Sequence, residues 1–175
     1  MMRIPKEIDT GRKVESCIDA LWHNYQERKA QQPTEIPMYD TASRYGCGYP
    51  IPYFQRQLVW SQAQKVAFIE SLWLGLYPGT YCIHRADWHK GGAPRQFSGW
   101  LIDGQQRLTA IQEYWDGLFS VFGLYWAELT PQEVRRFKGI KFTHQEVAVW
   151  DEGQIKDLYN RMAFGGTAHR LEEAA

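Results

Sequence analysis

The residues with the most evident chemistry form one segment, Asp103-Gly104-Gln105-Gln106-Arg107. It follows an apolar run at 99–102 and precedes apolar residues at helical spacing, so we predict a strand, a turn and a helix. The first N–H groups of a helix lack partners within the helix, and the helix dipole favours an anion there. Gly104 would let a phosphate approach the backbone, and Arg107 could hold two phosphate oxygens. Gln105 and Gln106 add neutral donors, so the segment predicts a phosphate-binding turn.

The same segment has a second interpretation as a helix cap. Asp103 at the N-cap and Gln106 three residues later would form a reciprocal capping box, which stabilises a helix by about 1 kcal/mol. This leaves Gly104 and Arg107 unexplained, because glycine weakens a first turn and a cation there opposes the dipole by about 0.3–1 kcal/mol. A bound anion would make a cation at this helix terminus favourable, and so would remove the cost of Arg107. Both interpretations stay open on sequence alone.

A divalent cation would fit the phosphate interpretation. Without one, Asp103 would repel the phosphate beside it, and Mg²⁺ commonly binds through few carboxylates together with phosphate oxygens. We therefore expect Mg²⁺ together with a bound phosphate, and Asp103 as the metal ligand. His84, Asp87 and His89 match no standard zinc spacing and are better explained as a surface loop. No P-loop, G-x-S-x-G or H-E-x-x-H motif is present, which removes the commonest rival enzyme classes.

Two further segments could contribute to the same cleft. Gln55 and Arg56 follow the aromatic residues Tyr53 and Phe54. In one interpretation, Arg56 reaches the phosphates while one of these rings stacks on a base. The alternative is a strand edge with a solvated arginine. Gly165-Gly166-Thr167 follows the last expected helix and could close over the cleft.

The elements that must position these residues alternate without a regular βαβ rhythm, which predicts a compact α+β fold. Helices are expected at 12–30, 61–76 with Ser61 as N-cap, 104–118, from Thr130 in a capping box, and 151–163. Strands are expected at 80–84, 99–102 and 146–150, a strand or hairpin at 119–128, and a loop at 33–53. We divide the chain into an N-terminal helix and loop, 1–45, and a nucleotide-binding domain, 46–175.

Composition limits the class of protein further. Twenty basic and twenty acidic residues give a formal net charge of zero, which argues against a protein that simply coats nucleic acid. Three cysteines, far apart, favour reduced thiols in a cytoplasmic protein. No apolar run approaches the roughly 18 residues of a membrane span, so no membrane partner is expected.

The motif belongs to a longer pattern that resembles the N-terminal domain of GmrSD-type proteins. The pattern comprises a QR-x-x-x-W segment from Gln55 to Trp60, a helix through Ile69 to Gly75, and DGQQR-L-T-A from Asp103 to Ala110. A closing segment, Asn160 to Thr167, resembles a later motif of the family. The resemblance implies a ParB/sulfiredoxin-like fold and hydrolysis of a nucleoside triphosphate coupled to DNA cleavage, in defence against foreign DNA.

Carried over by position, the resemblance assigns the expected site residues. The catalytic group would be Asp103, Gln105, Gln106 and Arg107. The nucleotide-binding group would be Gly104, Arg107, Gln55, Arg56, Gly165, Gly166 and Thr167. Sulfiredoxin has a nucleophilic cysteine where Gln105 stands, so reductase chemistry is not expected. Full-length family members carry a separate nuclease domain with a histidine-asparagine motif, so we expect a partner to supply cleavage here.

The rival interpretation is a non-catalytic protein. A domain of this kind without a nuclease could bind DNA or a partner protein, and so recruit or inhibit a nuclease or defence system. Turnover separates the two interpretations, because a binding factor would show saturable binding without release of phosphate.

Overall fold

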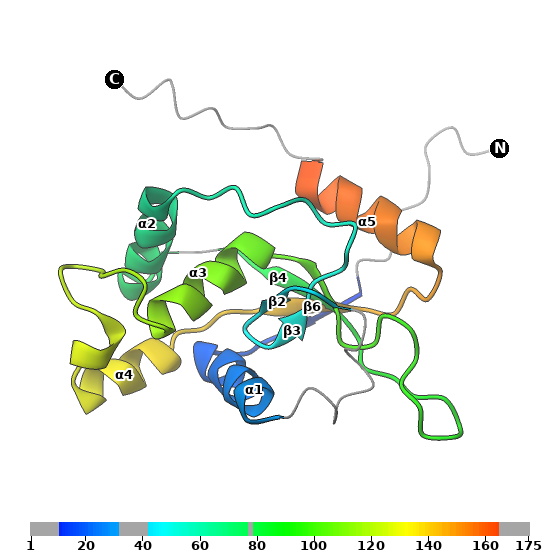
Figure 1. Ribbon diagram of the computed structural model, residues 1–175, viewed down its shortest axis with the longest axis horizontal. Helices are drawn as coiled ribbons and strands as arrows, with labels where there is room; N and C mark the ends of the chain where they lie inside the picture. The colour runs from blue at the N-terminus through cyan, green and yellow to red at the C-terminus, as the bar shows by residue number, and fades with distance from the viewer. Residues whose placement is uncertain (1–10, 32–41, 77–78, 165–175) are drawn as a thin grey trace.

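A four-stranded mixed sheet forms the centre of the protein (Figure 1). The computed structural model describes residues 11–31, 42–76 and 79–164. The strand order is β1-β6-β4-β5, in which β4 and β6 are parallel and the outer pairs are antiparallel. The strands of the sheet are β1 (Arg12–Val14), β4 (Tyr81–His84), β5 (Leu101–Asp103) and β6 (His144–Val147).

Helices cover both faces of this sheet, which confirms the predicted α+β class. They are α1 (Ile18–Ala30), α2 (Gln62–Trp73), α3 (Gln105–Trp115), α4 (Pro131–Lys138) and α5 (Glu152–Phe164), with a short 3₁₀ helix η3 (Trp126–Glu128). Successive strand residues point to opposite faces. Tyr81 and Ile83 join the core beneath α1, α2 and α3, whereas Cys82 and Ile102 join the core beneath α5. Figure 1 shows α1 and α5 on opposite sides of the sheet.

Local sequence signals placed several elements correctly. Ser61 is the N-cap of α2 and forms a capping box with Gln64, and Thr130 does the same with Glu133 at the start of α4. The strand expected at 80–84 is β4, and the strand expected at 99–102 is β5, which begins two residues later and ends one residue later. These signals succeed because each of them lies within a few neighbouring residues.

Other expectations about the elements differ from the structure in their bounds or in their type. The helix expected at 12–30 begins only at Ile18, because Arg12–Val14 pairs with β6 as an edge strand. Of the loop expected at 33–53, residues 33–41 lie outside the described residues, and the rest contains a hairpin of β2 (Tyr45–Gly46) and β3 (Tyr49–Pro50). Between 119 and 128 the chain forms an isolated bridge and η3. The strand expected at 146–150 runs from His144 to Val147.

The first 45 residues contribute directly to this architecture where they are described. β1 pairs with β6, and α1 buries Ile18, Leu21 and Tyr25 in the larger core. The proposed boundary between 1–45 and 46–175 stays a prediction. Among the described residues, no helix has the length and apolar character needed to cross a membrane.

Two buried histidines on the sheet make stability dependent on pH. Burial lowers the pKa of His84 and of His144, which are 0% and 7% exposed. An unfolded histidine takes up its proton near pH 6.5, so just below that pH only the unfolded chain gains charge. We therefore expect full stability above about pH 7 and a loss of at most about 1.4 kcal/mol per histidine for each pH unit below about 6.5. Urea unfolding at about pH 7.5 and at about pH 5.5 measures this change in the free energy of unfolding. A His144→Asn variant should show a smaller difference between the two pH values, and an unchanged difference would contradict this account of His144.

Candidate functional site

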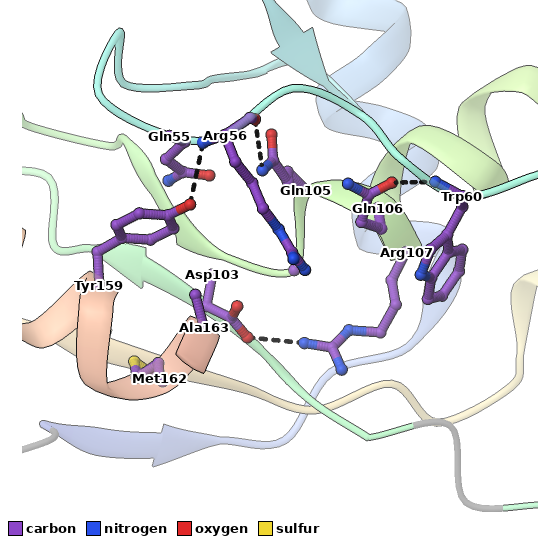
Figure 2. A pocket seen from close by; sticks show the side chains of 11 residues that line it. Gln55, Arg56, Trp60, Asp103, Gln105, Gln106, Arg107, Tyr159, Met162 and Ala163 are labelled. Atoms are coloured by element: carbon purple, nitrogen blue, oxygen red, sulfur yellow. Dashed lines mark hydrogen bonds and ion pairs between the residues drawn. The ribbon is translucent and has the colours of Figure 1, made fainter. Parts of the chain in front are cut away.

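A pocket of about 240 Å³ lies where β5 ends and α3 begins. Its walls come from three parts of the chain: the segment 55–60, the turn from Asp103 to Arg107, and the last part of α5. Figure 2 shows the side chains of Arg56 and Arg107 directed toward the space beside Asp103. The tertiary structure therefore brings together the two segments that the sequence singled out.

Gly104 occupies the N-cap of α3, and this contradicts the capping-box interpretation of Asp103 and Gln106. Its φ of 99° lies in the region that favours glycine. A Cβ at this position would lie 2.6 Å from the Cβ of Tyr81 in β4. The fold therefore requires glycine here for its own packing, whether or not an anion binds.

The two glutamines of the motif hold the segment 55–60 against the start of α3. The Gln105 side-chain amide donates to the Arg56 carbonyl at 2.9 Å, and that of Gln106 donates to the Gln57 carbonyl at 3.3 Å. The Gln106 side-chain oxygen accepts from the backbone N–H groups of Val59 and Trp60, each at 3.2 Å. Both side chains are buried, so in this geometry they act as a clamp between two segments.

Removing the Gln106 amide should loosen this clamp. A Gln106→Leu change would leave two backbone N–H groups and one carbonyl without their partner, at a cost of roughly 1–3 kcal/mol. We expect faster hydrogen exchange at Val59 and Trp60, measured by mass spectrometry or NMR. Gln106→Glu keeps an acceptor for both N–H groups and should preserve most of their protection. Equal protection in the wild type and in Gln106→Leu would contradict the clamp.

Arg44 strengthens the same clamp and was missed in the sequence. Its guanidinium donates to the backbone carbonyls of Gln55 at 2.8 Å and Arg56 at 3.2 Å. The Gln55 side chain is buried and donates to the carbonyls of Leu101 and Ile102 in β5. Gln55 and Arg44 therefore position Arg56. No local motif marks Arg44, because its partners lie far from it along the chain.

The charged groups of the pocket are two arginines and one carboxylate. Arg107 Nη2 lies 2.7 Å from Asp103 Oδ2, and both side chains are one-quarter exposed. Arg107 Nε is buried and has no hydrogen-bond acceptor in the described structure. Arg56 is exposed, and its backbone N–H donates to the Tyr159 hydroxyl on α5 at 3.0 Å. The described charged side chains that line the pocket thus carry a net positive charge at a helix N-terminus.

Among the described residues that line this pocket, Asp103 carries the one carboxylate that a metal ion would find. In the described part of the chain, no group of three or more histidine, cysteine, aspartate and glutamate side chains is arranged to hold a metal. This donor set fits Mg²⁺ if substrate phosphates supply other ligands, since Mg²⁺ often uses only one or two carboxylates. Gly165, Gly166 and Thr167 lie outside the described residues.

The fold and the site thus define an α+β domain with a cationic pocket at a helix N-terminus. A family model described as "GmrSD restriction endonuclease, N-terminal domain" matches residues 38–162, which is more than half of the chain. The chain therefore belongs to this family, and its membership indicates a role in restriction of DNA by cleavage. Comparisons with curated proteins and with solved structures gave no match. The ParB/sulfiredoxin-like fold stays a prediction.

Proposed function

We propose that the pocket at the start of α3 binds the phosphates of a nucleoside triphosphate, and that hydrolysis of this nucleotide accompanies DNA cleavage in defence against foreign DNA. One observation carries the proposal. Arg56 and Arg107 converge on a helix N-terminus, and among the described lining residues Asp103 is the one carboxylate that opposes them. Guanidinium groups and a helix N-terminus both favour phosphate.

The size of the pocket suggests which part of the nucleotide it would hold. About 240 Å³ is below the roughly 300–1,000 Å³ of typical small-molecule sites. We infer that the phosphates enter the pocket and that the sugar and base lie over its open side. Trp60 lines this pocket and offers a half-buried ring for stacking. Rotation of the Arg107 guanidinium toward a phosphate would also give its Nε an acceptor.

Mg²⁺ is the metal that this proposal includes. Asp103 would hold it together with phosphate oxygens, and the ion would neutralise charge on the phosphates. Binding would then weaken when the metal is chelated.

In the proposed hydrolysis, a water oxygen forms a bond to the terminal phosphorus and the bond to the bridging oxygen breaks. Phosphate and a nucleoside diphosphate are released, and the attacking water loses its proton to the solvent. Arg56 and Arg107 would stabilise charge on the transferred group, and Asp103 would orient the water. Gln105 and Gln106 would act indirectly, by holding the segment that carries Arg56. A partner nuclease or a nuclease domain would cleave the DNA.

A specific observation favours a second candidate, a factor that binds without turnover. Asp103 is already ion-paired with Arg107, and the amides of Gln105 and Gln106 donate to backbone carbonyls. Among the described pocket residues, these are the side chains that could orient a water for attack on a phosphate. All three already have partners, which favours binding without hydrolysis. In this alternative, the protein binds DNA or a protein and recruits or inhibits a partner nuclease or defence system.

Calorimetric titration with ATP, GTP, CTP and UTP, with and without Mg²⁺, tests the proposal. We expect one nucleotide to bind in the micromolar range and chelation of Mg²⁺ to weaken it. A phosphate-release assay on the same samples then separates the candidates. Binding with turnover supports hydrolysis, and binding without turnover supports the second candidate. No binding of any of the four would overturn both the nucleotide site and the hydrolysis.

A further inference from the structure

Exposed apolar side chains gather at the far end of α3 from the nucleotide pocket. Two hollows of about 260 and 490 Å³ share Trp73, Leu74 and Arg136. We call their combined surface the apolar groove; its other lining residues include Phe122, Leu124, Leu76 and Ile140. The side chains of Leu74, Phe122 and Leu76 are more than half exposed. Contiguous exposed apolar surface of this kind marks interaction sites in soluble proteins.

Phe122 stands at the edge of this groove in an unfavourable backbone conformation. Val121 and Leu124 exchange two backbone hydrogen bonds, 2.9 and 3.0 Å long, around the two-residue turn Phe122-Gly123. Both turn residues have positive φ, 51° and 79°. Such a turn favours Asn-Gly, and a bulky residue at its first position costs free energy. The ring gives little packing in return, because Phe122 is 58% exposed.

We propose that the apolar groove binds a second copy of this chain, with Phe122 of each copy inserted in the groove of the other. A two-fold dimer needs a surface that is complementary to itself, and here a protruding ring lies beside a hollow. Figure 1 shows the loop between α3 and α4 projecting at the end of the molecule opposite α5. The nucleotide pocket would therefore stay open in the dimer.

The charges around the groove fit this arrangement. Glu133 lines the hollow beside the Phe122 turn, and Lys141 lines the hollow on the other side of Arg136. A two-fold axis through the groove would bring Glu133 of each copy toward Lys141 of the other. These two favourable pairs would outweigh the single approach of Arg136, which lines both hollows, to Arg136 of the second copy. Complementary charge of this kind sets the orientation of partners more than it sets their affinity.

Sedimentation velocity without nucleotide, at concentrations from micromolar to millimolar, tests the proposal. We expect a dimer whose dissociation constant rises at least about thirtyfold in Phe122→Asn, as for loss of a central aromatic side chain. Leu74→Glu, at an exposed groove position, should have a similar effect. Trp88→Asn replaces a ring outside the groove that is 53% exposed, close to the 58% of Phe122, and should leave the dimer unchanged.

Thermal unfolding of dilute, monomeric protein gives an independent readout. Phe122→Asn should unfold at a higher temperature than the wild type, because asparagine suits positive φ. A lower unfolding temperature with unchanged mass would show that Phe122 serves the monomer, and would overturn the proposal. A monomer at every concentration would overturn it too, as would a dimer unaffected by both groove variants. Because no nucleotide is present, these outcomes are independent of the nucleotide site.

Discussion

Replacing Arg107 with alanine should weaken nucleoside triphosphate binding by about tenfold to more than a hundredfold, the loss expected for a charge-assisted contact to phosphate. Arg107 lies in the first turn of α3, where its guanidinium and the helix N-terminus face one pocket. The change also leaves Asp103 without the cation that now lies 2.7 Å away, so a carboxylate would face the phosphates. Calorimetric titration with the preferred nucleotide measures the loss.

Two further variants make this result specific. Arg135→Ala removes an exposed arginine of α4 that is absent from the pocket walls, and its affinity should match the wild type. Asp103→Asn distinguishes the role of the carboxylate. If Asp103 holds Mg²⁺, the variant should bind more weakly and lose its dependence on the metal. If Asp103 only pairs with Arg107, removal of the negative charge should tighten binding. Unchanged affinity in Arg107→Ala, with wild-type unfolding temperature, would contradict the proposed site.

Replacing Gly104 with alanine should destabilise the protein by roughly 2–5 kcal/mol, from a strained backbone together with overpacking. The φ of 99° disfavours any side chain, and the new Cβ would lie 2.6 Å from the Cβ of Tyr81. Tyr81 is buried in the centre of the sheet and cannot move aside without disturbing the core. Urea unfolding followed by circular dichroism measures the change in the free energy of unfolding.

Gly117 provides a matched control for this change. Its φ is 72°, and a Cβ built there would have no atom within 4 Å. Gly117→Ala should therefore cost only about 1 kcal/mol, from backbone conformation without a clash. Equal losses in the two variants would mean that the contact with Tyr81 relaxes easily. The pocket would then tolerate a shift between β4 and the start of α3.

The sequence indicated the position of the site but not how it is built. Asp103 to Arg107 and the segment around Arg56 were both singled out, and the structure places them in one pocket. The expected role of Gln105 and Gln106 as phosphate donors did not anticipate their bonds to the segment 56–60. Their roles as catalytic residues stay predictions. Arg44 escaped notice because its bond partners include Gln105, 61 residues further along the chain.

The sequence by itself determined what depends on near neighbours. Helical spacing and the caps at Ser61 and Thr130 located α2 and α4, because a cap needs only residues three positions apart. Tertiary structure decided the pairing of β1 with β6, 130 to 134 residues away, which turned an expected helical turn into a strand. Tertiary structure also explains why residue 104 must be glycine. A Cβ at this position would clash with Tyr81, which belongs to the neighbouring strand β4. Long-range packing of this kind overrides local preference, because burial and strand pairing stabilise more than the weak propensities of single residues.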